Sequence, residues 1–165
     1  MAEAPTTSTT AGNADTSAAS DSPHEDLLSD LIGTYRELNL TIRPLAEAQL
    51  TTGDAGTSIR EEIARLREEE FVFAQTLKEK LTGVDTGVEE QKAPVTDTSS
   101  PDVTTAMLIS QFGSARETTL SLLRGLDNAG WSQPFQDGKP LLDHVQALVA
   151  RDRKHLDRIS SILKS

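Results

Sequence analysis

The sequence has no cysteine and few aromatic residues, and each shortage excludes something. Without cysteine the chain forms no disulfide, has no thiolate nucleophile and binds no metal through sulfur. Aromatic residues make up only 4% of the 165 residues, so a core has to be built from Leu, Ile, Val and Ala. That composition favours helices, because strands are rich in aromatic and β-branched residues.

Long apolar runs are also missing. No stretch approaches the roughly 18 consecutive apolar residues that a transmembrane helix needs. Residues 1–20 contain neither the basic region nor the apolar region of a signal peptide. We therefore expect a cytoplasmic protein without a membrane partner.

Positive charge is scarce. The chain has 16 Lys and Arg against 26 Asp and Glu, a formal net charge of −10. An acidic surface repels phosphate backbones, so we expect no nucleic-acid partner.

The N-terminal residues differ in composition from the rest. Residues 1–23 are mostly Thr, Ser, Ala, Gly and Asp, with hardly any large apolar side chain. Such a segment buries too little surface to offset the entropy lost on ordering, so we predict a disordered tail. Residues 24–165 are predicted to form one domain.

Apolar residues recur three and four apart in four segments, which predicts four amphipathic helices. Pro44 is expected to distort the end of the first helix, and Gly83 to cap the end of the second. Residues 51–57 and 128–140 are predicted loops. The four helices are expected to run from about Pro23 to Leu45, Thr57 to Leu81, Ser100 to Leu126, and Pro140 to Leu163.

The longest break within the domain is residues 83–100, rich in Gly, Pro, Asp and Ser. Neighbouring antiparallel helices need only short turns, whereas a connection of this length fits a crossover. The sequence therefore predicts an all-α, four-helix bundle with a long crossover between the second and third helices.

Four ionisable residues occupy apolar positions of the helical stripes: Glu70, Arg116, Asp152 and His155. Burying an unpaired charge is costly, so these residues are expected to meet one another if the second and fourth helices run antiparallel. One interpretation is a pocket with a general base or a metal. The other is a structural salt-bridge layer, or stripe positions at a solvent-exposed end of the bundle. Most of the charged run at 67–70 is expected to face solvent.

Three stretches resemble the DinB-like superfamily of bacterial four-helix proteins. Each carries a loose pattern from one of the last three helices, and together they span most of residues 24–165. The stretches are SIREEIARLREEEFVF (58–73), ARETTLSLLRGLDNAGW (115–131) and PLLDHVQALVARDRKHLDRI (140–159).

The resemblance implies a metal site. Relatives commonly bind a divalent metal through three histidines, one on the second helix and two spaced i, i+4 on the fourth. Several resemble transferases that use bacillithiol or mycothiol, and many form homodimers. Here the three positions fall on Arg65, Arg151 and His155. Arginine stays protonated and cannot ligate a cation, so the site is expected to be degenerate and without a metal cofactor.

The other histidines do not replace the missing ligands. His144 lies about 16 Å along the helix from His155, at about 1.5 Å per residue. His24, at the start of the domain, is the only other one. Three histidines are too few for a ferritin-like or hemerythrin-like metal carrier. Glu62 also has no histidine three residues later, so the E-x-x-H unit of di-iron carboxylate bundles is missing there.

The sequence therefore leaves two functions open. The first is a non-catalytic or metal-free DinB-like protein in which the two arginines and His155 pair with Glu69, Glu70 and Asp152, or bind a small anionic or thiol ligand. The alternative is a thiol-dependent transferase-like enzyme with an altered metal site. Whether the chain is an enzyme stays open, and a homodimer is expected from the resemblance alone.

Overall fold

The structure is a computed structural model that describes residues 23–53, 58–84 and 102–164. Within these ranges it is all-α and has no β-strand. The predicted N-terminal tail, apart from Pro23, and most of the predicted crossover lie outside the described residues. Thr57 and Ser100, where the second and third helices were predicted to begin, also lie outside them. No described helix combines the length and the hydrophobicity needed to cross a membrane.

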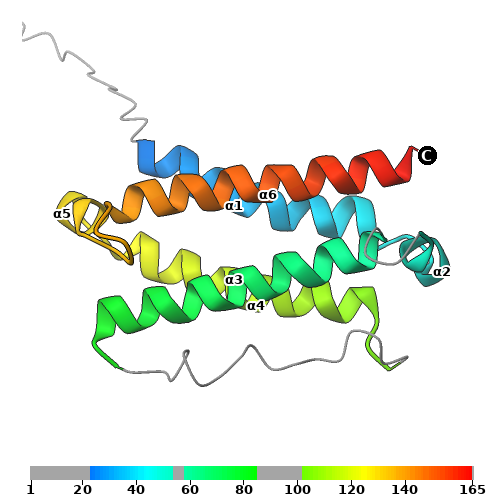
Figure 1. Cartoon of the computed structure of the whole chain (residues 1–165), viewed down its shortest axis with the longest axis horizontal. Coiled ribbons are helices and arrows are strands. Elements are labelled where there is room, and N and C mark those ends of the chain that lie inside the picture. The colour runs from blue at the N-terminus through cyan, green and yellow to red at the C-terminus, as the bar shows by residue number, and fades with distance from the viewer. Residues whose placement is uncertain (1–22, 54–57, 85–101, 165) are drawn as a thin grey trace, which may run out of the picture.

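Four long helices form the bundle, as the apolar periodicity predicts (Figure 1). Two short helices lie at its opposite ends. One lies just before the predicted loop at residues 51–57, and the other lies inside the predicted loop at residues 128–140. A π-helical turn, η1 (Leu38–Ile42), follows the first helix. The helices are α1 (Pro23–Glu37), α2 (Glu47–Thr51), α3 (Ile59–Thr82), α4 (Thr105–Arg124), α5 (Asn128–Ser132) and α6 (Leu141–Leu163).

Helices α3 and α4 run parallel. Arg67 contacts Gln111, and further along both helices Glu70 contacts Thr119. The end of α3 and the start of α4 therefore lie at opposite ends of the bundle (Figure 1). A connection between them has to cover the length of the bundle, so the predicted crossover topology is confirmed.

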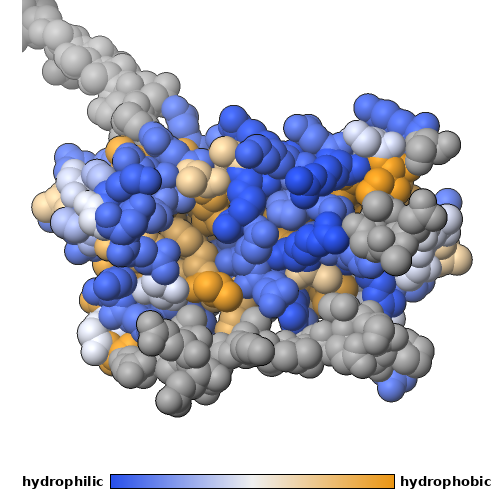
Figure 2. Space-filling model, in the orientation of Figure 1, coloured by the Kyte–Doolittle hydropathy of each residue, from blue (hydrophilic) through white to orange (hydrophobic). Residues whose placement is uncertain are grey.

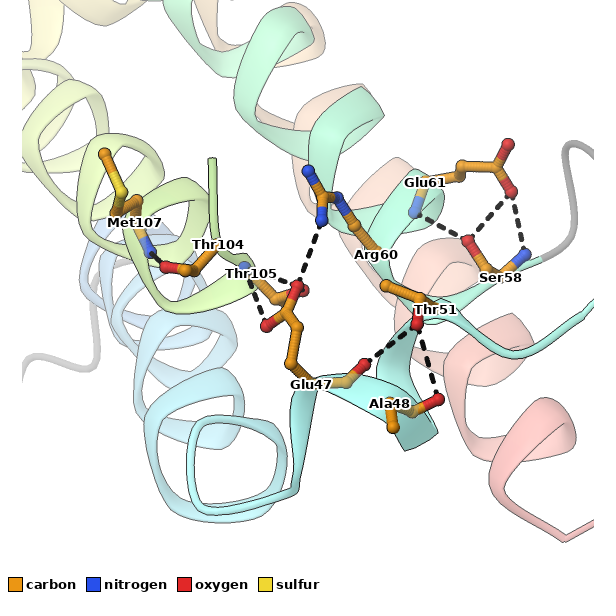
Figure 3. Close-up of polar contacts among 9 residues, drawn as sticks. All are labelled: Glu47, Ala48, Thr51, Ser58, Arg60, Glu61, Thr104, Thr105 and Met107. Carbon is orange, nitrogen blue, oxygen red and sulfur yellow. Dashed lines mark hydrogen bonds and ion pairs between the residues drawn. The ribbon is translucent and has the colours of Figure 1, made fainter. Parts of the chain in front are cut away.

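Glu47 of α2 holds the starts of α3 and α4 together (Figure 3). Its carboxylate accepts hydrogen bonds from the Thr105 backbone N–H at 3.1 Å and from the Thr105 hydroxyl at 2.8 Å. The Arg60 guanidinium donates to the same carboxylate at 3.2 Å. A carboxylate at a helix N-terminus is favoured because the first N–H groups have no partner within the helix.

The start of the third long helix was predicted wrongly. It begins at Thr105, after Thr104, and not near Ser100–Asp102. The Thr104 hydroxyl accepts the Met107 N–H at 3.2 Å, and Glu47 satisfies the Thr105 N–H. This cap depends on a contact with α2, which the sequence near residue 100 does not reveal.

Residues next to each helix in the sequence determine the other helix ends described here. Ser58 and Glu61 form a capping box at the start of α3. Gly83 ends that helix with φ of +67°, a conformation that glycine adopts most easily, as predicted. The first long helix gives way to η1 before Pro44, so it ends short of the predicted Leu45.

The core consists of two apolar clusters separated by a charged layer. One cluster lies toward α5 and includes Trp131, and the other lies toward α2 and includes Leu50. On α4, Arg116 lies between Phe112 of one cluster and Leu120 of the other. The layer between the clusters contains the residues that the stripes singled out.

Candidate functional site

Three of the four charged stripe residues meet at the centre of the bundle. Nη2 of Arg116 lies 2.8 Å from the Glu70 carboxylate and 2.8 Å from the Asp152 carboxylate. These side chains are only 1–2% exposed. They come from α4, α3 and α6, so one guanidinium links three helices. We call Glu70, Arg116 and Asp152 the ionic triad.

Neighbouring groups hold the triad in place. The Thr119 hydroxyl donates a 2.6 Å hydrogen bond to Glu70. Arg116 donates to the backbone carbonyl of Leu31 in α1 at 3.4 Å, and its guanidinium carbon lies 4.8 Å from the Phe112 ring centroid. Every long helix of the bundle therefore contributes to fixing the guanidinium.

The triad has two carboxylates for one cation. Burial raises the pKa of Glu70, while the Arg116 guanidinium and the Thr119 hydrogen bond oppose the rise and the nearby Asp152 adds to it. The pKa of Glu70 is therefore higher in the folded protein than in the unfolded chain. The folded protein binds a proton on the Glu70 carboxyl group more tightly, and this proton binding stabilises the fold. That stabilisation is complete below the ordinary carboxyl pKa and is lost as pH rises through the raised pKa.

The variant Glu70→Gln tests this dependence. Glutamine keeps the shape but does not titrate, so its stability relative to wild type is expected to increase as pH rises from 4.5, the ordinary glutamate pKa, toward neutrality. Urea unfolding of both proteins across this range measures the difference. The exposed control Glu68→Gln should show no such trend, and a constant or falling difference for Glu70→Gln would refute the raised pKa.

His155 belongs to a second network and not to the triad. Its Nδ1 lies 2.7 Å from Glu62, and its Nε2 lies 3.4 Å from Glu69. No hydrogen bond or ion pair within the described ranges joins it to Glu70 or Asp152, which corrects the expected grouping. Asp152 instead pairs with Arg116 of α4, whereas His155 contacts Glu62 and Glu69 of α3.

Three arginines complete this second network. Arg65 pairs with Glu62, Arg151 Nε lies 2.7 Å from Glu69, and Arg158 lies 3.5 Å from Glu62. All three are more than a third exposed. The seam network is therefore Glu62, Arg65, Glu69, Arg151, His155 and Arg158, and it follows the α3–α6 contact. Figure 2 shows hydrophilic residues over the middle of these two helices.

Glu62 and Arg158 are the members that sequence reasoning missed, and Glu62 is the buried one. It is only 3% exposed and contacts three members of the seam network. It lies three residues after Ile59 and four before Leu66, at the edge of the apolar stripe, and that spacing was the available signal. The expectation for residues 67–70 was also partly wrong, because Arg67 is buried as well as Glu70.

The remaining histidines lie elsewhere. His144 Nε2 is 2.8 Å from Asp137, and hydrogen bonds from Lys139 and His144 lower the pKa of that carboxyl. His24 stacks on Trp131 with ring centroids 4.4 Å apart. Neither histidine extends the seam network.

The donor set of the seam suits ion pairing better than metal binding. No group of three or more His, Cys, Asp or Glu in the described part of the chain is arranged to hold a metal ion. Glu62 and Glu69 instead face guanidinium groups, which cannot ligate a cation. The chain matches no protein-family model, no curated protein and no solved structure.

Proposed function

We propose that this chain is a DinB-like four-helix protein that works without a metal, and that the seam network occupies the region where relatives bind one. One observation carries the proposal. Arg65, Arg151 and His155 are the positions that the resemblance assigns to metal ligands. Arg65 contacts Glu62, Arg151 contacts Glu69, and His155 contacts both carboxylates.

The charges support this replacement. A metal dication and two guanidinium groups bring the same formal charge to a site. Glu62 is 4% exposed at its side chain, so it needs a cation beside it, and the guanidinium groups of Arg65 and Arg158 lie next to its carboxylate. The network can therefore join α3 to α6 without a metal.

A site without a metal argues against the metal-dependent transferase activity of the relatives. In the DinB-like transferases a metal lowers the pKa of the bound thiol, and a single imidazole does not hold such a metal. We therefore assign this chain a binding role and not metal-dependent group transfer. The alternative, a thiol-dependent transferase with a changed ligand set, would need Glu62, Glu69 and His155 to bind a metal beside the guanidiniums of Arg65 and Arg151.

Elemental analysis of protein purified without an affinity tag or chelator tests the proposal. We expect well under one zinc or nickel ion per chain, and an unchanged melting temperature after dialysis against EDTA, because no metal contributes to folding. A sample incubated with zinc and then desalted serves as the control for adventitious uptake. Stoichiometric zinc or nickel, removed by EDTA with a fall in melting temperature, would support the transferase alternative instead.

A further inference from the structure

A row of three cations lies along the second half of α6. Arg151, Lys154 and Arg158 are three and four residues apart, so they lie on one face of the helix. Lys154 comes two residues after the buried Asp152, which is about 200° around the helix, so this face points to solvent. None of the three side chains is buried, and the row is about 10 Å long at about 1.5 Å per residue. We call these three residues the basic row.

The basic row keeps a positive charge in spite of its ion pairs. Arg151 pairs with Glu69, and Arg158 pairs with Glu62. Lys154 is exposed and makes no hydrogen bond or ion pair with the described residues. The Glu62 side chain is only 4% exposed, so one of the two carboxylates lies below the surface. The row is therefore a locally positive surface.

The second half of α6 is rich in cations. Residues 151–164 contain five Lys and Arg, none of them buried, and Asp157 is the one exposed acid among them. These are five of only 16 Lys and Arg in a chain with 26 Asp and Glu. Arg65 of α3 lies in the same seam, and its side chain is 44% exposed. The chain is acidic as a whole, but this surface attracts anionic groups.

A guanidinium that already has one carboxylate partner can bind another. It has five N–H donors, and Arg116 of the ionic triad lies 2.8 Å from both Glu70 and Asp152. The side chains of Arg151 and Arg158 are 38% and 58% exposed. Each can therefore bind a carboxylate from outside and keep its contact with α3. The Lys154 ammonium adds three further donors.

We propose that the basic row binds an extended acidic segment of a partner protein, with carboxylates on Arg151, Lys154 and Arg158. In an extended segment every second side chain points the same way, about 6.6 Å apart at about 3.3 Å per residue. The cations of the row are about 4.5 and 6 Å apart along the helix, so long side chains can meet these carboxylates. A DNA duplex or a membrane surface is wider than the row and would also meet the rest of this acidic chain, with its net charge of −10. A short acidic segment meets the row alone.

Fluorescence anisotropy of a labelled peptide in which glutamate and serine alternate tests the inference on the full chain. At about 0.1 M salt the screening length is about 10 Å, so the peptide senses the row more than distant charges. We expect saturable binding to wild type and an affinity about tenfold lower for Lys154→Glu, because the reversed charge repels the peptide. The same peptide with glutamine in place of glutamate should not bind. Lys78→Glu makes the same change at an exposed position of α3 outside the row and should bind like wild type.

Several results would overturn the inference. They include no binding to wild type, equal binding of the glutamate and glutamine peptides, or equal affinities in Lys154→Glu and Lys78→Glu. Tighter binding of a DNA duplex or of phosphatidylserine vesicles, lost in Lys154→Glu, would assign the row to a different partner. In a further variant the seven Asp and Glu of residues 1–22 and 85–101 are changed to Asn and Gln. If only that variant binds the peptide, a segment of this chain occupies the row, and the proposed partner is wrong.

The inference rests on the proposed binding role but not on the absence of a metal. The zinc and nickel content of the same samples therefore separates the two proposals. Peptide binding by a protein with stoichiometric zinc would contradict only the metal-free site. A metal-free protein that does not bind the peptide would contradict only the basic row as a docking surface.

Discussion

Replacing Arg116 by methionine is expected to lower the free energy of unfolding at pH 7 by about 3–5 kcal/mol. Methionine fills much of the same space but provides no charge. The Asp152 carboxylate, which is 2% exposed, would lie beside Glu70 in the core without a cation. Removing one partner of a buried ion pair is costly because the other charge stays away from water. Urea unfolding followed by circular dichroism measures the loss.

Two further variants show whether that loss of stability comes from the broken ion pairs. Arg124 is a matched surface control, because its side chain is 47% exposed and only 3.5 Å from Glu117, so Arg124→Met should cost less than about 1 kcal/mol. Combining Arg116→Met with Glu70→Met and Asp152→Leu removes all three charges and should recover most of the lost stability. If Arg116→Met does not fold, a folded combined variant still shows that the unpaired carboxylates caused the loss of stability. A cost for Arg116→Met as small as that of the surface control would contradict a structural role for the triad.

The helical stripes predicted the triad because they identify which residues point inward. Glu70, Arg116 and Asp152 occupy apolar positions of three helices, and three buried charges of mixed sign have to pair. The prediction needed only the antiparallel arrangement of α3 and α6, which the contacts of Glu62 and Glu69 with α6 show. The helical periodicity also gave the all-α class, and the length of the break at residues 83–100 gave the crossover.

The seam network was harder to predict because spacing does not say which neighbour a side chain meets. His155 shares the stripe of Asp152 but turns to Glu62 and Glu69. Glu62 lies at the edge of its stripe, where a carboxylate can be either buried or solvated. The start of α4 at Thr105 likewise depends on Glu47 of another helix. These details depend on contacts between helices and not on local sequence.

Arg65→His combined with Arg151→His is expected to create a zinc site. With His155 the variant would have one histidine on α3 and two spaced i, i+4 on α6, and that spacing places the α6 pair on one face. Position 65 lies one turn from both Glu62 and Glu69, the residues that contact His155. The Glu62 carboxylate at Nδ1 of His155 would fix the ring with Nε2 toward the metal, as carboxylates do in zinc proteins.

The matched control removes the same two charges without adding ligands. Arg65→Gln with Arg151→Gln leaves one histidine, which does not hold zinc. We expect a dissociation constant for zinc of about 1 μM or lower in the histidine variant, equivalent to about −8 kcal/mol. The glutamine variant and the wild type should show no comparable affinity. Zinc should also raise the melting temperature of the histidine variant alone, since it binds only the folded state.

The most direct test of a metal site replaced by ion pairs is a zinc titration of wild type, the histidine variant and the glutamine variant under the same conditions. The account predicts one zinc per chain, bound with about micromolar affinity, in the histidine variant only. Stoichiometric zinc binding by the wild type, or none by a folded histidine variant, would contradict it.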